Sequence, residues 1–325
     1  MEKAAPRQIN YLRMSITDRC NLRCRYCTYW QEWEKLSNRE ILSYEELLRV
    51  ARMAAKMGIQ KIRVTGGEPL LRRGVVGFLH NLNQVPGIEE VCLTTNGVML
   101  PELAPALHET GLRHLNLSLD TLRRERYWKI TGRDKWREVM AGLKLVVSLG
   151  FQPIKINCVV LKGINDDELV DLALLARDNP FQVRFIELMP SVSPEWWDRH
   201  FLPMAEVRRR LAVLGFAKPV PRQASAGPAR IFCYPGFQGK VGFISPISQH
   251  HCHTCNRLRL TANGRLRPCL VAGPEFDLKG LLRQSFSEGF LSDLFQKAIS
   301  LKRGEVKSPW IEPHRSCFNM VGIGG

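Results

Sequence analysis

Three cysteines near the start of the chain have the residue type and spacing for metal chemistry. Cys20, Cys24 and Cys27 form a C-x3-C-x2-C pattern directly after a strand-like run. A structural zinc site usually takes four ligands in two separated pairs, and a four-iron cluster normally takes four thiolates. If this compact loop holds a cluster, one iron lacks a protein ligand and can bind another molecule. A zinc knuckle with a distant fourth ligand, or reduced surface thiols, are the alternatives.

The same loop resembles the signature of the radical S-adenosylmethionine (SAM) superfamily. The resemblance rests on the cysteine spacing and on Tyr26, the aromatic residue before the last cysteine. In that superfamily the open iron chelates the amino and carboxylate groups of SAM, and the reduced cluster cleaves SAM into methionine and a 5′-deoxyadenosyl radical. The resemblance implies a cofactor chemistry, so the substrate must be inferred from the rest of the chain.

A second group of cysteines lies nearer the C-terminus. Cys252 and Cys255 form a C-x2-C pair, and a predicted hairpin returns Cys269 beside it. On spacing alone, this group suits a Cys3His zinc site or a second three-thiolate iron cluster. Arg257 and Arg259 leave the loop on one face and favour the iron cluster. The candidate fourth ligands for zinc are His250, His251 and His253.

Size and composition predict a cytoplasmic protein with an anionic ligand. The 325 residues can bury a substantial core, and no run approaches the roughly 18 apolar residues of a membrane span. The first residues lack the apolar core of a secretory signal. The formal net charge of +16 favours an anionic partner. Because Lys and Arg are dispersed rather than gathered in one stripe, we expect neither nucleic acid nor a membrane to be that partner.

Strand-like and helical segments alternate through residues 1–218. The predicted strands are Asn10–Thr17, Lys61–Thr65, Glu90–Thr95, His114–Leu119, Ile154–Val160 and Gln182–Leu188. The predicted helices are Ser43–Met57, Val75–Leu82, Glu102–Glu109, Trp136–Leu149, Asp166–Arg177 and Met204–Leu214. This alternation predicts an α/β fold, a partial (β/α)6 TIM-type barrel, with an open doubly wound sheet as the alternative. Residues 219–325 are predicted to form a C-terminal region that carries the second cysteine group and closes the barrel mouth.

The predicted strands have one apolar face and one polar face. Period-2 alternation places Arg13, Arg63, Lys155 and Arg184 opposite the apolar residues, so these cations point into the barrel lumen if the apolar faces meet the helices. Several buried cations need anionic partners or water. A polyanionic ligand in the lumen would supply them. The alternatives are strand ends in solvent, or pairing with Glu68 or Asp120. Cys92 and Cys158, in two of these strands, are predicted to be small core residues.

Motifs along almost the whole chain resemble the molybdenum cofactor biosynthesis protein A family. They are Arg13–Cys27, Thr65–Pro69, Leu93–Gly97, Asn116–Asp120, Lys162–Asp166, Arg184–Met189, Gly242–Ser245, Cys252–Cys269 and the terminal Gly324–Gly325. The resemblance implies two four-iron clusters, with GTP between them. It also assigns contacts residue by residue: Tyr26, Gly67, Ser118 and Met189 match SAM contacts, and Arg13, Arg63, Thr95, Lys155, Arg257 and Arg259 match GTP contacts. Because Arg184 shares the luminal face, we expect it to bind GTP as well.

The activity of that family is GTP 3′,8-cyclase. The resemblance implies that the deoxyadenosyl radical abstracts the C3′ hydrogen of GTP and that the C3′ radical attacks C8 of guanine. It also implies partners: an electron donor such as flavodoxin or ferredoxin, and a downstream cyclic pyranopterin monophosphate synthase. The sequence leaves the oligomeric state open, with a homodimer as one option. The competing hypotheses are a peptide-modifying radical SAM enzyme and a basic zinc protein that binds nucleic acid.

Overall fold

The computed structural model describes residues 7–27, 34–221, 227–250, 252–271, 273–284, 288–303 and 320–323. His251 and the predicted Gly324–Gly325 tail lie outside these residues. None of the helices in the described part of the chain combines the length and apolar character needed to cross a membrane.

Six parallel strands form the centre of the fold. They are β1 (Tyr11–Ser15), β2 (Lys61–Thr65), β3 (Glu90–Thr95), β4 (His114–Ser118), β5 (Ile154–Val160) and β6 (Gln182–Glu187). Each strand pairs in parallel with the next in the sequence. Right-handed crossovers of this kind place helices on the outer face and leave the other face as a lumen. The strands agree with the sequence-based prediction to within about two residues at each end.

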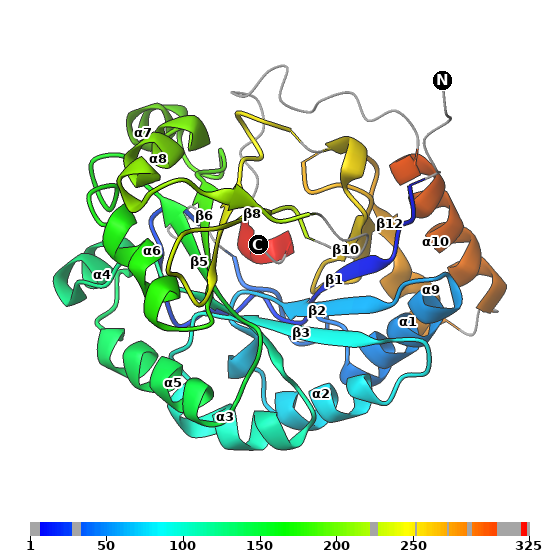
Figure 1. Cartoon of the computed structure of the whole chain (residues 1–325). Helices are drawn as coiled ribbons and strands as arrows, with labels where there is room; N and C mark the ends of the chain where they lie inside the picture. Colours follow the sequence, from blue (N-terminus) through cyan, green and yellow to red (C-terminus); the bar gives the residue numbers. More distant parts are fainter. Residues whose placement is uncertain are drawn as a thin grey trace.

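Helices surround this sheet on its outer side (Figure 1). They are α1 (Tyr44–Lys56), α2 (Val75–Asn83), α3 (Leu100–Glu109), α4 (Arg124–Thr131), α5 (Trp136–Ser148), α6 (Leu169–Asp178), α7 (Pro194–His200) and α8 (Met204–Arg210). A capping box begins α1: the Glu46 N–H donates to the Ser43 hydroxyl, and the Ser43 N–H donates to the Glu46 carboxylate. Two helices, α4 and α7, were absent from the prediction.

Strands from the C-terminal region extend the same sheet at both edges. They are β7 (Lys218–Pro219), β8 (Arg230–Cys233), β9 (Lys240–Ile244), β10 (Arg257–Leu260), β11 (Arg265–Arg267) and β12 (Phe276–Asp277). β9 pairs in parallel with β6, and β10 pairs in parallel with β1. The order runs from β12 to β7, and in the described residues no pairing joins these two edges. The prediction of an α/β partial barrel is therefore confirmed, and this barrel is not closed.

Three further helices complete the chain, namely α9 (Leu278–Arg283), α10 (Glu288–Arg303) and α11 (Met320–Ile323). Three short 3-10 helices are Pro69–Leu71, Leu211–Leu214 and Cys252–Thr254. α11 lies inside the ring of strands, at the centre of the view in Figure 1. Ile323 at its end is buried, so the last described residues of the chain reach the interior of the barrel.

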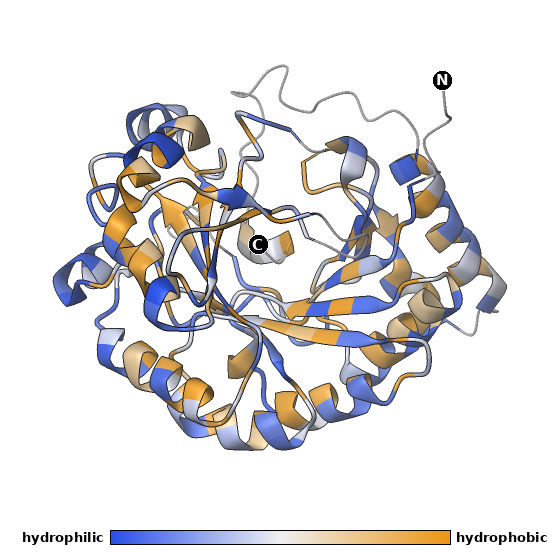
Figure 2. Cartoon of the chain, in the orientation of Figure 1, coloured by the Kyte–Doolittle hydropathy of each residue, from blue (hydrophilic) through white to orange (hydrophobic). Residues whose placement is uncertain are grey.

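Apolar side chains fill the layer between sheet and helices. Leu12, Met14, Ile62 and Val64 are fully buried in this layer. In Figure 2, hydrophobic and hydrophilic residues alternate along the strands. Burial of this layer provides the main stabilisation of the fold, and it fixes which residues of each strand face the lumen.

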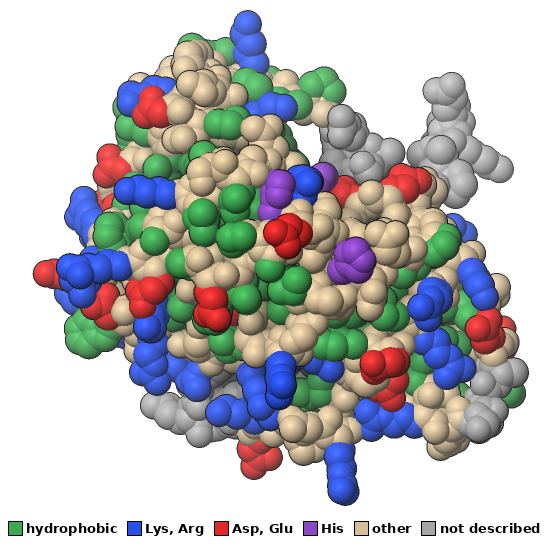
Figure 3. Space-filling view, turned by 90° about the horizontal axis from the view of Figure 1, so that it is seen from below, with side chains coloured by type: hydrophobic (Ala, Val, Ile, Leu, Met, Phe, Trp, Pro, Cys, Tyr) green, Lys and Arg blue, Asp and Glu red, His purple; other side chains and the backbone are tan. Residues whose placement is uncertain are grey.

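Charged side chains are dispersed on one face of the molecule. On the face shown in Figure 3, basic side chains lie scattered among acidic and apolar ones. The high net charge therefore does not form one stripe on this face.

Candidate active site

One cavity inside the ring of strands collects the residues that the sequence singled out. Its volume is about 360 Å³, and its walls come from the luminal faces of the strands and from both cysteine groups. All the predicted site residues line it: Arg13, Cys20, Cys24, Tyr26, Cys27, Arg63, Gly67, Thr95, Ser118, Lys155, Arg184, Met189, Cys252, Cys255, Arg257, Arg259 and Cys269. Residues from both ends of the chain thus meet in a single space. The role of each one remains a prediction.

The N-terminal cysteine loop is held against the end of α4. The Arg23 N–H donates to the Thr131 carbonyl oxygen at 2.7 Å, and the Arg25 N–H donates to the Ile130 oxygen at 3.0 Å. α4 ends at Gly132, whose φ of 66° lies in the left-handed region that glycine adopts without strain. These contacts fix the loop at the carboxyl ends of the strands, where ligands of parallel sheets usually bind.

The three thiols of this loop suit an iron–sulfur cluster. The Cys20 sulfur accepts hydrogen bonds from the Leu22 N–H at 3.4 Å and from Asn96 Nδ2 at 3.8 Å, and such bonds tune cluster thiolates. Burial raises the pKa of the Cys20 thiol to about 11 and also raises the pKa values of Cys24 and Cys27. Bare thiolates would therefore be costly here, and bound iron would supply the positive charge that stabilises them.

A glycine turn at the end of β2 lies directly against the cysteine loop. The Gly67 N–H donates to the Thr17 oxygen, and the Glu68 N–H donates to the Arg19 oxygen, both at 2.7 Å. A methyl group at Gly67 would lie 2.8 Å from the Asp18 oxygen and closer still to the Arg19 carbonyl. Only glycine permits this approach of the two backbones, which brings the turn to the edge of the cavity.

Glu68 organises the polar edge of the cavity from a fully buried position. Its carboxylate accepts hydrogen bonds from Thr95 Oγ1 at 2.8 Å, from the Asn96 N–H at 2.6 Å and from the Leu70 N–H at 3.0 Å. Burial raises its pKa to about 7, although these hydrogen bonds act in the opposite direction. The Thr95 hydroxyl also accepts from the Gly97 N–H. Because its proton goes to Glu68, Thr95 can contact a ligand only as an acceptor.

Tyr26 is fixed beside the cysteines by Asp120. The phenol donates to Asp120 Oδ2 at 2.7 Å, and the Val159 N–H donates to Asp120 Oδ1 at 2.8 Å. The Ser191 hydroxyl donates to the Tyr26 carbonyl oxygen at 2.6 Å. Burial raises the pKa of Asp120 to about 6, against the effect of these two hydrogen bonds. The carboxylate thus holds the ring in one orientation at the cavity wall.

The luminal cations predicted from strand alternation do point into the cavity. Arg63 is 3% exposed, and its Nε donates to the Tyr11 hydroxyl at 2.6 Å. Its Nη1 is buried and has no hydrogen-bond partner among the described residues. Arg184 donates twice to the Gln182 side-chain oxygen, at 2.6 and 3.1 Å. Neither guanidinium has a carboxylate as its hydrogen-bond partner, so both suit an anionic ligand.

The lowered pKa of Lys155 indicates an excess of positive charge in the lumen. Burial lowers its pKa, and the neighbouring Arg184 and Arg63 lower it further, to about 7. Glu68 and Asp120 were the acids that could have neutralised the luminal cations. Instead, both accept the backbone and hydroxyl hydrogen bonds described above. The arrangement therefore favours a polyanionic ligand over internal pairing.

The second cysteine group lies on another wall of the same cavity. Cys252 opens a 3-10 turn, and the Cys255 N–H donates to the Cys252 oxygen at 3.2 Å. Burial opposes the Cys255 thiolate, but Arg257 and Lys302 outweigh it and lower the pKa of Cys255 to about 5. A thiolate ligand is thus favoured at Cys255.

The distances between these sulfurs indicate whether the second cysteine group could hold a single zinc ion. In a tetrahedral zinc site, sulfurs bonded at about 2.3 Å lie about 3.8 Å apart. Among the described residues, three ligand atoms come within 4.8 Å of one another only at Glu90, Cys92 and His114. The sulfurs of neither cysteine group are that close, which disfavours a single zinc ion at Cys252, Cys255 and Cys269.

Further cavity residues were absent from the predicted set. They include Tyr11, Lys61, Asn96, Asp120, Asn157, Glu187, Lys302 and Met320. Lys61 shares a strand face with Arg63, so alternation could have found it. Lys302 and Met320 follow long connections, and their sequence gives no signal for this place.

Comparisons with known proteins agree with this geometry. Residues 14–176 match the model of the radical SAM superfamily, and residues 181–308 match that of Molybdenum Cofactor Synthesis C. GTP 3′,8-cyclase of Moorella thermoacetica is 45% identical to the chain over 327 residues, covering 100% of both. The chain belongs to the GTP 3′,8-cyclase family. The cyclase of Geobacter sulfurreducens is 41% identical, covering 98% of both chains.

A solved structure supports the fold of this cyclase family member. The crystal structure of Streptococcus suis SuiB bound to S-adenosylmethionine superposes with a TM-score of 0.63 at 14% identity. The match covers 89% of this chain and 65% of SuiB, so it speaks for the fold alone. As a radical SAM protein, the chain is an enzyme whose cofactors are SAM and an iron–sulfur cluster.

Proposed function

We propose that the chain converts GTP into (8S)-3′,8-cyclo-7,8-dihydroguanosine 5′-triphosphate, the first step of molybdenum cofactor biosynthesis. The main support for the proposal is a single cavity in which buried cations lie between the two cysteine groups. The relatives named GTP 3′,8-cyclase, identical to this chain at 41–45% of positions, support the same substrate. In this reaction a SAM-derived radical takes the C3′ hydrogen of GTP, and the resulting C3′ radical forms a bond to guanine C8. One electron, supplied by the proposed electron donor, and one proton then convert the guanine radical into the 7,8-dihydro product.

The N-terminal site would hold a [4Fe–4S] cluster on Cys20, Cys24 and Cys27. When reduced, this cluster supplies the electron that cleaves SAM into methionine and a 5′-deoxyadenosyl radical. The residues proposed to hold SAM are Tyr26, Gly67, Ser118 and Met189, all in the cavity wall. The Gly67 turn brings backbone close to the cysteine loop, and Tyr26, fixed by Asp120, covers it on one side.

The luminal cations would bind the triphosphate. The residues proposed to contact GTP are Arg13, Arg63, Thr95, Lys155, Arg184, Arg257 and Arg259. A triphosphate offers many acceptor oxygens, which the unpartnered Nη1 of Arg63 requires. Asn116 and Asn157 each carry a buried Oδ1 with no hydrogen-bond partner among the described residues. These oxygens suit the donor groups of a nucleoside, so the lumen can fix the ribose relative to the cysteine loop.

A second [4Fe–4S] cluster on Cys252, Cys255 and Cys269 is part of the proposal. It is supported by the three cysteines lining the same cavity and by the low pKa of Cys255. With three protein thiolates, one iron would remain open toward the lumen, where the guanine of GTP is expected. Metal analysis of the reconstituted protein tests this directly: iron and sulfide sufficient for two clusters are the expected result, and a zinc ion held by three sulfurs would contradict the second cluster.

The partners follow from the same proposal. An electron donor such as flavodoxin or ferredoxin would reduce the first cluster, and cyclic pyranopterin monophosphate synthase would consume the product. A second concave surface, lined by Arg25, Arg123, Arg124, Arg126 and Lys129, lies beside the cysteine loop. Its basic character suits an acidic redox protein. The division at residue 218 and a homodimeric assembly remain predictions.

The decisive experiment is anaerobic turnover with SAM, a reductant and GTP deuterated at C3′. Deuterium in the 5′-deoxyadenosine product is expected, because the radical takes the hydrogen from that carbon. SAM cleavage without deuterium transfer would keep the superfamily and overturn the substrate. A control with Cys24→Ala, which removes a proposed ligand of the first cluster, should cleave no SAM.

A further inference from the structure

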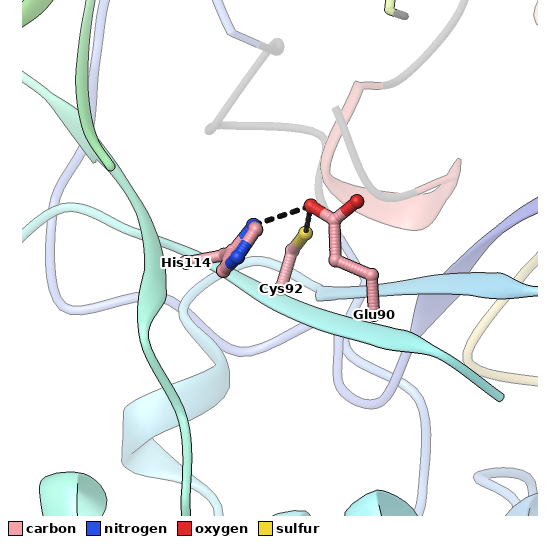
Figure 4. A group of neighbouring side chains, drawn as sticks. All are labelled: Glu90, Cys92 and His114. Carbon is pink, nitrogen blue, oxygen red and sulfur yellow. Dashed lines mark hydrogen bonds and ion pairs between the residues drawn. The ribbon is translucent and has the colours of Figure 1, made fainter. Parts of the chain in front are cut away.

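A cluster of three ligand-type side chains lies apart from both cysteine groups. Glu90 and Cys92 come from β3, and His114 comes from the neighbouring β4 (Figure 4). Cys92 lies opposite His114 in the register of the two strands, and Arg63 lies opposite Cys92 on the other side. Because Arg63 faces the lumen, the cluster lies on the luminal side of the sheet.

The three side chains contact one another closely. His114 Nδ1 lies 2.5 Å from Glu90 Oε1, and the Cys92 thiol donates to the same oxygen at 3.0 Å. All three ligand atoms lie within 4.8 Å of one another. Cys92 is fully buried, whereas His114 and Glu90 are 34% and 23% exposed. Cys92 and Cys158 are both fully buried core residues, as predicted. The thiol of Cys92 also belongs to this polar cluster, whereas Cys158 packs in the apolar core.

The ligand set determines which ion the cluster suits. A thiolate, an imidazole and a carboxylate are the three ligand types that zinc prefers, and three protein ligands leave one tetrahedral position open. Ligand atoms of a tetrahedral zinc ion lie about 3.3–3.8 Å apart, so the present atoms need to separate by roughly an ångström or less. The Glu90 side chain can supply that movement by a change of rotamer.

We propose that Glu90, Cys92 and His114 form a binding site for one zinc ion, with its fourth position open to a water or to a ligand oxygen in the lumen. This site is separate from the two cysteine groups. It goes beyond the proposed GTP cyclase activity and does not depend on it.

The neighbouring cations do not prevent the binding of zinc. Lys61 Nζ lies 2.6 Å from Glu90 Oε2, the oxygen that does not contact His114. Glu90 can therefore ligate through one oxygen and keep the Lys61 ion pair through the other. A thiolate and a carboxylate together carry two negative charges, which match the charge of the ion. Lys61 lines the cavity, whereas Glu90, Cys92 and His114 are not among the residues that line it, so the zinc ion would bind beside the proposed triphosphate site rather than within it.

Zinc retention in the holoenzyme tests the proposal. Both clusters are reconstituted anaerobically, iron is measured, and the protein is titrated with zinc against a chromophoric chelator. The wild type is expected to bind one zinc ion per chain that Cys92→Ala binds at least tenfold more weakly, at equal iron content. Cys158→Ala is the matched control, because it also removes a fully buried thiol, and it should bind zinc as the wild type does. Equal zinc binding by wild type and Cys92→Ala would overturn the proposal.

X-ray absorption at the zinc edge of the wild-type protein tests the proposed zinc site without any variant. One sulfur and two or three nitrogen or oxygen ligands are expected. A shell of three sulfurs would place the zinc in a cysteine group and refute the assignment. If Cys92→Ala does not fold, Glu90→Gln keeps the side-chain volume and removes the anionic ligand. Zinc binding must weaken in that variant, and unchanged binding contradicts the site.

Discussion

Arg63 is a buried guanidinium whose hydrogen-bond partner is a phenol rather than a carboxylate. Burial opposes the Arg63 charge, but Cys92, Tyr11 and Glu90 outweigh burial and raise the pKa of Arg63. We therefore expect Arg63→Met to lower the free energy of unfolding modestly. The same change should weaken GTP binding about tenfold or more, since a charge-assisted hydrogen bond to phosphate is lost.

Chemical denaturation and GTP retention on the anaerobic protein measure the two effects. The iron content of the N-terminal cluster should stay the same. Arg73→Met is the control, because Arg73 is exposed, and it should change neither quantity. Unchanged GTP affinity in Arg63→Met would remove Arg63 from the triphosphate site.

Lys155, one of the residues proposed to contact GTP, is expected to make GTP binding depend on pH. Its pKa is lowered to about 7 by burial and by two arginines, whereas an unfolded lysine titrates near about 10.4. Between these values the unfolded chain binds a proton that the folded chain lacks, so this group makes stability rise with pH. A bound triphosphate favours the charged lysine, so GTP binding takes up a proton above pH 7. Affinity should then fall by up to about tenfold per pH unit.

Titration calorimetry of GTP between pH 6.5 and 9 measures this dependence, together with proton uptake in buffers of different ionisation enthalpy. Lys155→Arg keeps its charge throughout this range. If Lys155 is the group responsible, the arginine variant shows a flatter profile. Parallel profiles for both proteins would exclude it.

At the scale of elements, α4 links the cysteine loop to a basic surface. The loop backbone pairs with the end of α4, and Arg25 lies over the Trp196 ring at 6.0 Å. Arg25 and Lys129 line this surface and have no ion pair among the described residues, unlike Arg124, which pairs with Asp134. Charge complementarity mainly speeds association, so reversing both free cations should slow electron delivery by an acidic carrier protein.

The double variant Arg25→Glu/Lys129→Glu tests this expectation. Reduction of the cluster by flavodoxin should slow at least tenfold, with a weaker dependence on salt. Reduction by dithionite, which needs no docking surface, should be unaffected. Lys144→Glu on α5 changes an exposed charge elsewhere and serves as the control. Equal flavodoxin rates in all three proteins would place the docking surface elsewhere.

The elements differ in how well the sequence predicts them. The strands are predicted well because their apolar residues alternate, and this pattern also places Arg63 and Lys155 in the lumen. α4 was missed because its residues are mostly polar and its first turn lacks a side-chain cap. α7 had a signal, since Ser193 caps it and Pro194 begins it. The contact between Cys92 and His114 depends on strand register, which local sequence does not specify.

At the scale of the molecule, distant segments complete the site. β10, which carries Arg257 and Arg259, pairs with β1 beside Arg13. The prediction included the hairpin but not this pairing, because contacts between segments so far apart in the sequence leave no local pattern. Every predicted site residue nevertheless reaches the cavity. Strand alternation pointed to the cations Arg63, Lys155 and Arg184, and the family resemblance supplied residues such as Gly67 and Met189. Their arrangement around one lumen required the fold.

The last described residues of the chain also lie at the cavity. Met320 lines the cavity, and Ile323 is buried inside the ring of strands. Two residues without side chains add almost nothing to an apolar core, and deleting Gly324 and Gly325 should leave the unfolding temperature unchanged. Conversion of GTP is expected to be lost, because these residues follow directly on a segment that lines the cavity. Turnover assays and thermal unfolding of the shortened chain measure both, and an active truncated enzyme would exclude a role for the tail.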